Sequence, residues 1–146
     1  MVQREATDIE RLKEQAGEFF TKTRSVKCPA FPNEVISFNG KGLLHLFYSG
    51  SRSERSESEV SARIKLLGRA VKLLQLMPIP QEESQRTDQN GKVFKYWAFE
   101  GVVDEFRLKV IVRQKGHGKK HFWSVVPAWR KTRFGRQNSR SDLSRL

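Results

Sequence analysis

The sequence predicts an α+β fold in which N-terminal helices pack on one face of a small antiparallel β-meander sheet of about four strands. Three observations support this prediction. Apolar residues recur at helical spacing in two segments of the first half of the chain. Three runs rich in Val, Phe, Trp and Tyr follow in the second half. Short connections join these runs, which favours antiparallel pairing of neighbours.

The two helical segments are residues 5–24 and about residues 57–77. Their apolar positions are Ile9, Leu12, Ala16, Phe19 and Phe20 in the first, and Val60, Ile64, Leu67, Val71 and Leu74 in the second. The prolines of MPIP end the second helix. Between the helices, EVISFNGKG predicts a short strand that runs into an Asn-Gly turn. GLLHLFYSG, residues 42–50, is too short for its period to separate strand from helix, and QEESQRTDQNGK reads as a polar loop.

The strand runs begin at Val93 and are VFKYWAFEGVV, EFRLKVIVRQK and HFWSVVPAW. In the middle run, alternation places one set of side chains toward the helices and a second set on the open face of the sheet. The first set is Phe106, Leu108, Val110 and Val112, and the second is Arg107, Lys109, Ile111 and Arg113. The faces of the last run stay open, because a shift of one residue would exchange them.

The length of 146 residues is typical of one domain. We expect a single domain over residues 1–128 and a basic tail over residues 129–146, whose composition is typical of disordered segments. The net charge is +12, and residues 51–146 carry 21 Lys and Arg against 10 Asp and Glu. Such a field attracts phosphates and acidic surfaces.

Several classes of protein are disfavoured by the composition. Cys28 is the only cysteine, so neither an intrachain disulfide nor a cysteine-based zinc site is expected. The sequence contains no HExxH, no CxxC and no dense carboxylate cluster, which predicts no metal and no cofactor. The N-terminus lacks a signal-peptide pattern, and no apolar run approaches about 18 residues. We therefore expect a cytoplasmic protein without a membrane partner.

Three stretches in order resemble a known group of enzymes. They are GLLHLFYSG, SARIKLLGRAVKLL and WAFEGVVDEFRLKVIVRQKGHGKKHFWSVVP. Together they resemble the phage-associated branch of the barnase, EndoU, colicin and RelE-like nucleases, over roughly residues 35–127. The shared features are a histidine in the early apolar segment, arginines before or within the next helix, and a final strand of the form aromatic-Ser-Val-x-Pro. No glutamate is clearly placed as a barnase-like general base.

The resemblance implies helices on a four-stranded antiparallel sheet and a metal-independent ribonuclease, of the kind deployed as a toxin or phage effector. Such an enzyme needs a base for the ribose 2′-OH, an acid for the leaving oxygen and cations at the phosphate. Imidazole suits proton transfer and guanidinium suits phosphate. The candidate catalytic residues are His45, Arg63, Lys109, His121 and Ser124. The candidate RNA-binding residues are Arg52, Arg55, Arg107, Arg113, Lys115, Lys119 and Lys120.

Each of these residues also has a plain structural interpretation. A histidine within GLLHLFY is equally typical of a packed core, and a row of cations is equally typical of a solvated sheet face.

Three functions follow from these alternatives. The first is a metal-independent endoribonuclease that cleaves RNA, tRNA included, by 2′-OH attack on the adjacent phosphate, with an acidic antitoxin or immunity protein as partner. The second is a noncatalytic nucleic-acid-binding module that stacks bases on aromatic side chains. Its candidate platforms are Trp97, Phe122, Trp123, Trp129 and Phe134. The third is a structural or inhibitory protein that docks an acidic partner.

Overall fold

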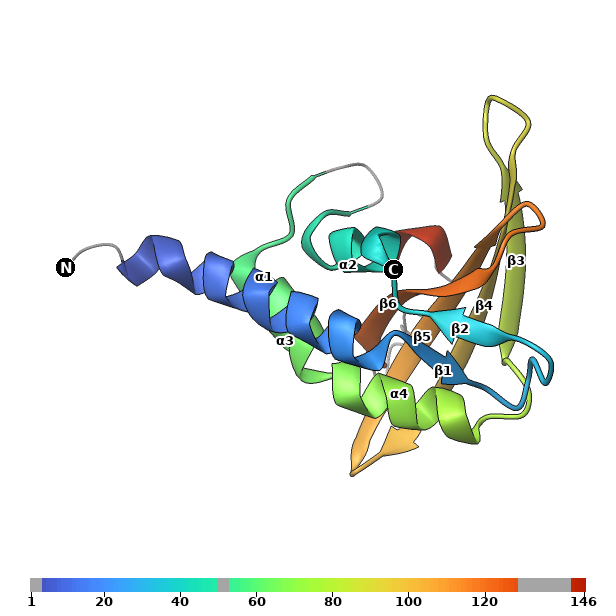
Figure 1. Cartoon of the computed structure of the whole chain (residues 1–146), viewed down its shortest axis with the longest axis horizontal. Coiled ribbons are helices and arrows are strands. Elements are labelled where there is room, and N and C mark those ends of the chain that lie inside the picture. The colour runs from blue at the N-terminus through green and yellow to red at the C-terminus, as the bar shows by residue number, and fades with distance from the viewer. Residues whose placement is uncertain (1–3, 50–52, 129–142) are drawn as a thin grey trace, which may run out of the picture.

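A computed structural model describes residues 4–49, 53–128 and 143–146 of the chain (Figure 1). These residues form a mixed α+β fold, as predicted, with four α-helices and a six-stranded sheet. The elements are α1 (Arg4–Thr23), β1 (Ser25–Lys27), β2 (Val35–Ser37), α2 (Gly40–Phe47), α3 (Glu57–Lys65), α4 (Leu67–Leu76), β3 (Glu82–Thr87), β4 (Val93–Val103), β5 (Phe106–Lys115), β6 (Lys120–Pro127) and the 3-10 helix η1 (Leu143–Arg145). None of the helices in these ranges is long and apolar enough to cross a bilayer.

The sheet has the strand order β1-β2-β6-β5-β4-β3. Neighbouring strands are antiparallel except β2 and β6, which run parallel where Ser37 lies opposite His121. The predicted meander is present as β4, β5 and β6, but the expected total of about four strands was wrong. The additional strands include β3, which lies inside the segment interpreted as a polar loop. Every residue of β3 is polar and nearly all are exposed, so this edge strand carries no alternation of apolar residues that could reveal it.

The helices follow the predicted positions with two changes. The segment expected as one helix over about 57–77 breaks at Leu66, which ends α3 and begins α4. The segment 42–50 contains a helix, α2, whose first turn is capped by the Asn39 side chain through the backbone N–H groups of Lys41 and Gly42. Asn39 therefore starts a helix instead of turning a hairpin, because its side chain supplies an acceptor for otherwise unbonded N–H groups.

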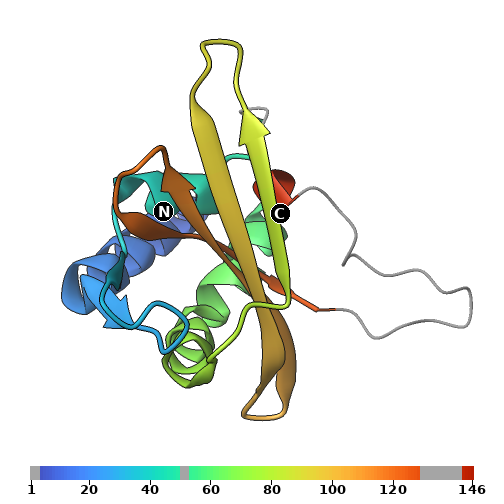
Figure 2. The same ribbon diagram turned by 90° about the vertical axis from the view of Figure 1, so that its right-hand side faces the viewer.

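The main core lies on one face of the sheet and contains residues of all four helices, which Figures 1 and 2 show grouped beside the sheet. Leu108, Val110 and Val112 of β5 point into it, as the alternation predicted. Phe106, the fourth residue of the predicted set, is 54% exposed and lies outside the core. The rings of Phe38 and Phe122 stack with their centroids 4.8 Å apart, which ties the chain before α2 to β6. This packing fixes α2 against the sheet, which matters for the site described below.

The opposite face of the sheet carries a smaller apolar cluster. Tyr96, Ala98 and Ile111 are buried there together with Leu143. The predicted tail is therefore divided: residues 129–142 lie outside the described residues, whereas residues 143–146 pack on this face. We call residues 143–146 the terminal segment and this side of the sheet the open face.

Candidate functional site

A β-bulge in β6 determines which side chains reach the open face. Ile111 pairs with Ser124 and Val112 pairs with Phe122, so Trp123 is an extra residue on β6. The bulge breaks the alternation, and both Trp123 and Ser124 turn to the open face while Phe122 stays in the core. Bulges commonly redirect side chains beside functional sites. The faces of this strand, left open by the sequence, therefore follow no regular alternation.

The helix α2 brings His45 onto the indole of Trp123. The two rings stack with centroids 3.9 Å apart and an interplanar angle of 16°. Close approach of α2 to β6 is possible because Gly42 faces the Phe122 backbone, where a Cβ would overlap the Phe122 carbonyl oxygen. His45 is 4% exposed. The imidazole is thus buried between α2 and β6, where it faces a group of arginine side chains.

Arg55 contacts both the imidazole and the backbone of His45. The chain folds back after α2 through an isolated bridge between Tyr48 and Glu54, which brings Arg55 to the end of that helix. Arg55 donates from Nε to the His45 carbonyl oxygen over 3.0 Å, and its Nη2 lies 3.1 Å from His45 Nε2. Because a guanidinium only donates, His45 Nε2 must accept, which leaves the proton of the neutral ring on Nδ1.

Arg63 reaches the bulge from α3. Its Nη1 donates to Ser124 Oγ over 2.7 Å and to the backbone oxygen of Leu146 over 2.6 Å. Ser124 Oγ donates to the same Leu146 oxygen over 2.8 Å. Arg63 is 8% exposed and Ser124 is fully buried. Two donors therefore converge on one oxygen of the terminal segment.

Arg113, on the open face of β5, completes the group. Its guanidinium lies 3.8 Å from the Trp123 ring centroid and 5.0 Å from that of Phe94. Its Nε donates to His121 Nε2 over 3.1 Å. His121, like His45, therefore accepts at Nε2. We call Arg55, Arg63 and Arg113, together with His45, His121, Trp123 and Ser124, the cationic cluster.

Burial and neighbouring cations keep both histidines neutral. Burial lowers the pKa of His45 to about 3, with further lowering by Arg55, Arg63 and Arg113. Burial lowers the pKa of His121 to about 4, with contributions from Arg113 and Lys41. The pKa of Arg63 falls to about 10, through burial first and repulsion from Arg55 second, so its guanidinium stays charged at neutral pH. At neutral pH the cluster is three cations around two uncharged imidazoles.

None of the three arginines forms an ion pair with an Asp or Glu side chain of the described residues. Glu59 raises the pKa of both Arg55 and Arg63, but its carboxylate is exposed and caps α3 through the Ser56 N–H. Partly buried guanidinium groups without carboxylate partners favour the binding of an anion. The electrostatics of the cluster therefore suit a phosphate.

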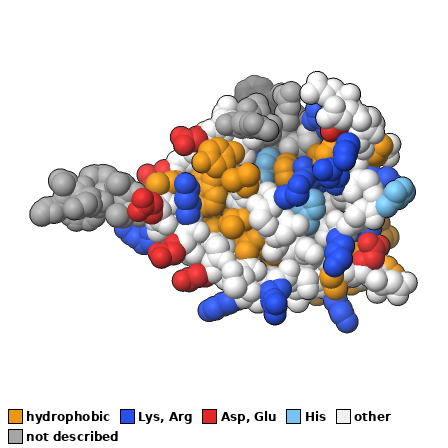
Figure 3. All heavy atoms as spheres, turned by 45° about the horizontal axis from the view of Figure 1, so that its top comes forward, with side chains coloured by type: hydrophobic (Ala, Val, Ile, Leu, Met, Phe, Trp, Pro, Cys, Tyr) orange, Lys and Arg blue, Asp and Glu red, His pale blue; other side chains and the backbone are white. Residues whose placement is uncertain are grey.

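A pocket of about 660 Å³ opens beside the cluster. Its lining residues are Lys41, Leu44, His45, Tyr48, Ser49, Arg86, Asp88, Gln89, Phe94, Tyr96, Arg113, Trp123 and Ser144. In Figure 3, lysine and arginine side chains gather next to histidine on one half of the visible face, whereas most acidic side chains lie toward α1. The pocket thus combines positive charge with aromatic walls.

The structure brings four of the five predicted catalytic residues together: His45, Arg63, His121 and Ser124 belong to the cluster. Lys109 lies on the open face, as predicted, but it is fully buried and its ammonium is 2.8 Å from the Glu82 carboxylate. This ion pair links β5 to the edge strand β3. The contacts that the structure shows for Lys109 therefore stabilise the sheet.

The predicted RNA-binding residues that the structure describes separate into three groups. Arg55 and Arg113 belong to the cluster, whereas Arg52 lies outside the described residues. Arg107, Lys115 and Lys119 are exposed, and Arg107 pairs with Glu100. Lys120 is only 7% exposed; its ammonium contacts both Glu34 carboxylate oxygens and lies 4.8 Å from the Phe31 ring centroid. Lys120 is therefore a packed residue whose charge is already neutralised, and its placement does not support phosphate binding.

The aromatic residues proposed for base stacking have other partners. Trp97 and Phe122 pack in or against the main core, and Trp123 already contacts His45 and Arg113. Trp129 and Phe134 lie outside the described residues. Base stacking on Phe122 would require the core to open, because its ring is fully buried.

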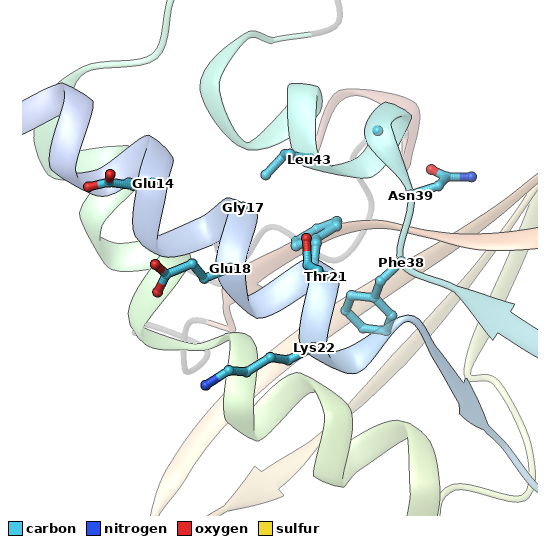
Figure 4. Close-up of a pocket in the computed structure, with 10 residues that line it drawn as sticks. Glu14, Gly17, Glu18, Thr21, Lys22, Phe38, Asn39 and Leu43 are labelled. Carbon is cyan, nitrogen blue, oxygen red and sulfur yellow. The ribbon is translucent and has the colours of Figure 1, made fainter.

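A second hollow, of about 790 Å³, lies between α1 and the start of α2 (Figure 4). Its walls include Gly17, Phe38 and Leu43, and the carboxylates of Glu14 and Glu18 lie at its edge. Those carboxylates would repel a phosphate. The larger volume alone therefore does not make it the better candidate for a polyanion.

Sequence reasoning missed several components of the site. Lys41, Arg86 and Tyr96 line the pocket, and Ser144 bonds to both Arg86 and Trp123. Arg86 was hidden because β3 reads as a loop. Tyr96 could have been found from alternation along β4, which places it on the same face as Ala98. No local pattern indicates that residues 143–146 return to the sheet.

Comparison of the chain with models of protein families, with curated proteins and with solved structures found no match. Within the described ranges, no group of three or more His, Cys, Asp or Glu side chains is arranged to hold a metal ion.

Proposed function

We propose that the protein is a metal-independent endoribonuclease that binds RNA at the cationic cluster. The observation that carries the proposal is the grouping of three arginines around a buried serine and two neutral histidines. None of these arginines pairs with an Asp or Glu side chain of the described residues. Guanidinium groups match the bidentate geometry of phosphate oxygens. RNA as substrate implies action in the cytoplasm, and an acidic immunity-type protein would compete for the same cations.

The reaction is transesterification at one phosphodiester. A base removes the proton of the ribose 2′-OH, and the 2′-oxygen forms a bond to phosphorus. The bond between phosphorus and the 5′-oxygen of the next nucleotide breaks, and that oxygen takes up a proton. The products carry a 2′,3′-cyclic phosphate and a 5′-OH. Negative charge gathers on the nonbridging oxygens in the transition state, where fixed donors are most effective.

Arg63 and Ser124 are proposed to donate to a nonbridging oxygen, because they already converge on one oxygen in the structure. Arg55 and Arg113 add positive charge around the phosphate. His121 accepts from Arg113 and has a pKa of about 4, so we assign it the role of positioning Arg113 and no acid function.

His45 is proposed as the base, and this role needs a change on substrate binding. Its pKa of about 3 makes the imidazole a weak base, and Arg55 occupies Nε2. A bound phosphate would attract Arg55 away from Nε2 and offset the repulsion from all three arginines. Both effects raise the pKa of His45, since a nearby anion stabilises the imidazolium.

The test is incubation of the purified protein with total RNA and with tRNA in EDTA, followed by analysis of the fragment ends. We expect cleavage with 2′,3′-cyclic phosphate ends, reduced about 10²-fold or more by His45→Asn and by Arg63→Gln. The matched control is Arg69→Gln on α4, whose guanidinium bonds to the Val103 carbonyl and lies over Phe106. Full activity in a folded His45→Asn protein would remove His45 from the mechanism.

The second candidate is a noncatalytic nucleic-acid-binding module. It is favoured by one observation: the Nε2 atoms of both buried histidines are occupied by arginine donors, and both pKa values are lowered. A wild-type protein that binds RNA through Arg63 and Arg113 but leaves it intact would establish this function instead.

A further inference from the structure

The terminal segment lies directly on the cationic cluster. The backbone oxygen of Leu146 accepts from both Arg63 and Ser124, at 2.6 and 2.8 Å. The Ser144 carbonyl oxygen accepts from the Trp123 indole over 3.2 Å, and Ser144 Oγ is 2.7 Å from Arg86 Nη1. The segment therefore satisfies four donors of the proposed RNA site at once.

The Leu146 oxygen marks a position suited to a phosphate oxygen. A charged guanidinium N–H and a hydroxyl converge on one acceptor, which is the arrangement used to bind oxyanions. A phosphate oxygen is an acceptor of the kind that these two donors bind. It cannot occupy the position while Leu146 is there.

The segment is held in place by apolar contacts as well as by hydrogen bonds. Leu143 is 2% exposed and packs with Tyr96, Ala98 and Ile111 on the open face. Leu146 packs against the same cluster. Apolar anchoring is independent of the cations, so the segment can hold its place beside the site when no RNA is bound.

We propose that Arg63 and Ser124 form a phosphate-oxygen subsite and that residues 143–146 occupy it as an autoinhibitory segment. RNA binds only when the segment leaves. This inference rests on the proposed function in that the competing ligand is RNA, but it concerns occupancy of the site and not the chemistry of cleavage.

The first experiment measures binding without cleavage. A fluorescent 2′-O-methyl oligoribonucleotide, which has no 2′-OH to attack, is titrated with the full chain, with a chain lacking residues 143–146 and with Leu143→Asn. Leu143→Asn loosens the apolar anchor and changes no charge. If the site is open in one molecule in ten, release of the segment tightens the apparent Kd about tenfold. Leu76→Asn, at an exposed position 70% accessible at the end of α4, is the control and should leave the Kd unchanged.

The second experiment uses the unmodified chain and remains informative if the shortened chain fails to fold. Hydrogen exchange of residues 143–146 is followed with and without the 2′-O-methyl oligonucleotide. Exchange should rise on binding, because the oligonucleotide displaces the segment. Unchanged or greater protection of these residues at saturation would overturn the proposal, as would an unchanged Kd in folded Leu143→Asn.

These experiments can reject the ribonuclease activity and the autoinhibition independently of each other. Tighter binding by the released chain, without cleavage of ordinary RNA by either form, would keep the subsite and its autoinhibition and reject the ribonuclease. Cleavage of RNA at the same rate by the full chain and by the Leu143→Asn variant would keep the ribonuclease and reject autoinhibition.

Discussion

Arg63 Nη1 donates to Ser124 Oγ over 2.7 Å, although the two residues are 61 positions apart in the sequence. The contact joins α3 to the bulge of β6 and aligns two donors on one point of the open face. Helix packing positions the guanidinium, and strand pairing positions the hydroxyl. The donor pair is therefore organised by the fold before any ligand binds, which is the condition under which such donors contribute most to catalysis.

Replacing Arg63 with lysine tests this alignment. Lys keeps the charge but carries it as a point charge on a flexible stem, without the rigid planar group that places Nη1 against Ser124 and Leu146. We expect RNA cleavage to fall about 10²-fold in Arg63→Lys. Rates at saturating RNA measure the effect, and urea unfolding checks that the variant is folded. Arg69→Lys serves as the control on α4, and equal rates in the two variants would show that charge alone matters at position 63.

The buried histidines predict a loss of stability on acidification. In the folded protein the pKa values of His45 and His121 are lowered to about 3 and about 4. In the unfolded chain they return to about 6.5. The unfolded state therefore binds more protons below about pH 6.5, and stability decreases as the pH falls through this window toward about 4. Each histidine contributes a slope of about 1.4 kcal/mol per pH unit within its window.

Urea unfolding between about pH 7 and pH 5 measures this slope. His121→Asn should flatten it, since one proton-linked group is removed. A stability that stays constant from about pH 7 to pH 5 would contradict the buried, neutral state of both imidazoles.

Gly42 predicts a steric limit at the contact between α2 and β6. A Cβ at this position would overlap the Phe122 carbonyl oxygen, which is backbone and cannot move aside. Gly42→Ala should cost about 2–3 kcal/mol of the free energy of unfolding. It should also separate His45 from Trp123, which near-ultraviolet circular dichroism of the indole would report.

Gly68→Ala is the matched comparison for that substitution. A Cβ at Gly68 meets nothing within 4 Å, and the residue lies within α4. We expect stabilisation of about 0.5–1 kcal/mol, because alanine loses less conformational entropy on folding. Similar effects of the two substitutions in thermal or urea unfolding would mean that α2 does not approach β6 as closely as described.

Salt dependence tests whether the cluster contacts phosphates. The affinity for a 2′-O-methyl oligonucleotide should fall steeply as salt rises, because bound phosphates release counterions. In Arg113→Gln, the slope of log K against log salt should decrease in magnitude by about 1. Lys72→Gln, which removes an exposed charge paired with Asp104, should keep the slope. An identical slope in Arg113→Gln would exclude Arg113 from phosphate contact.

The sequence predicted the parts of this fold that rest on local periodicity. The helix predicted over residues 5–24 is observed as α1, Arg4–Thr23, and alternation assigned Leu108 and Val112 to the core face of β5. It could not identify β3, because an edge strand with polar residues on both faces has no period. It could not place Leu143 on the sheet, because contacts across such a chain separation leave no local pattern. Ribonuclease activity, which the sequence also predicted, stays a prediction that the experiments above test.

The candidate site was predictable by residue type and not by geometry. Histidine, arginine and serine were selected for their chemistry, and His45, Arg63 and Ser124 do meet. The same reasoning chose Lys120, which packs against Phe31 and pairs with Glu34, because charge alone cannot show which face a lysine occupies. The neutral state of the histidines also depends on burial, which the sequence around them does not encode.

The extra residue in β6 has a genetic consequence. If Trp123 were deleted, Ile111 would still pair with Ser124 and Val112 with Phe122, and the strand would regain regular alternation. The interior would keep its residues, while the indole that holds His45 and Arg113 would be lost. The codon for Trp123 is thus the only difference between an ordinary meander and one that carries an indole on its open face. Selection, or a codon-insertion library, can therefore add or remove this indole without redesigning the interior.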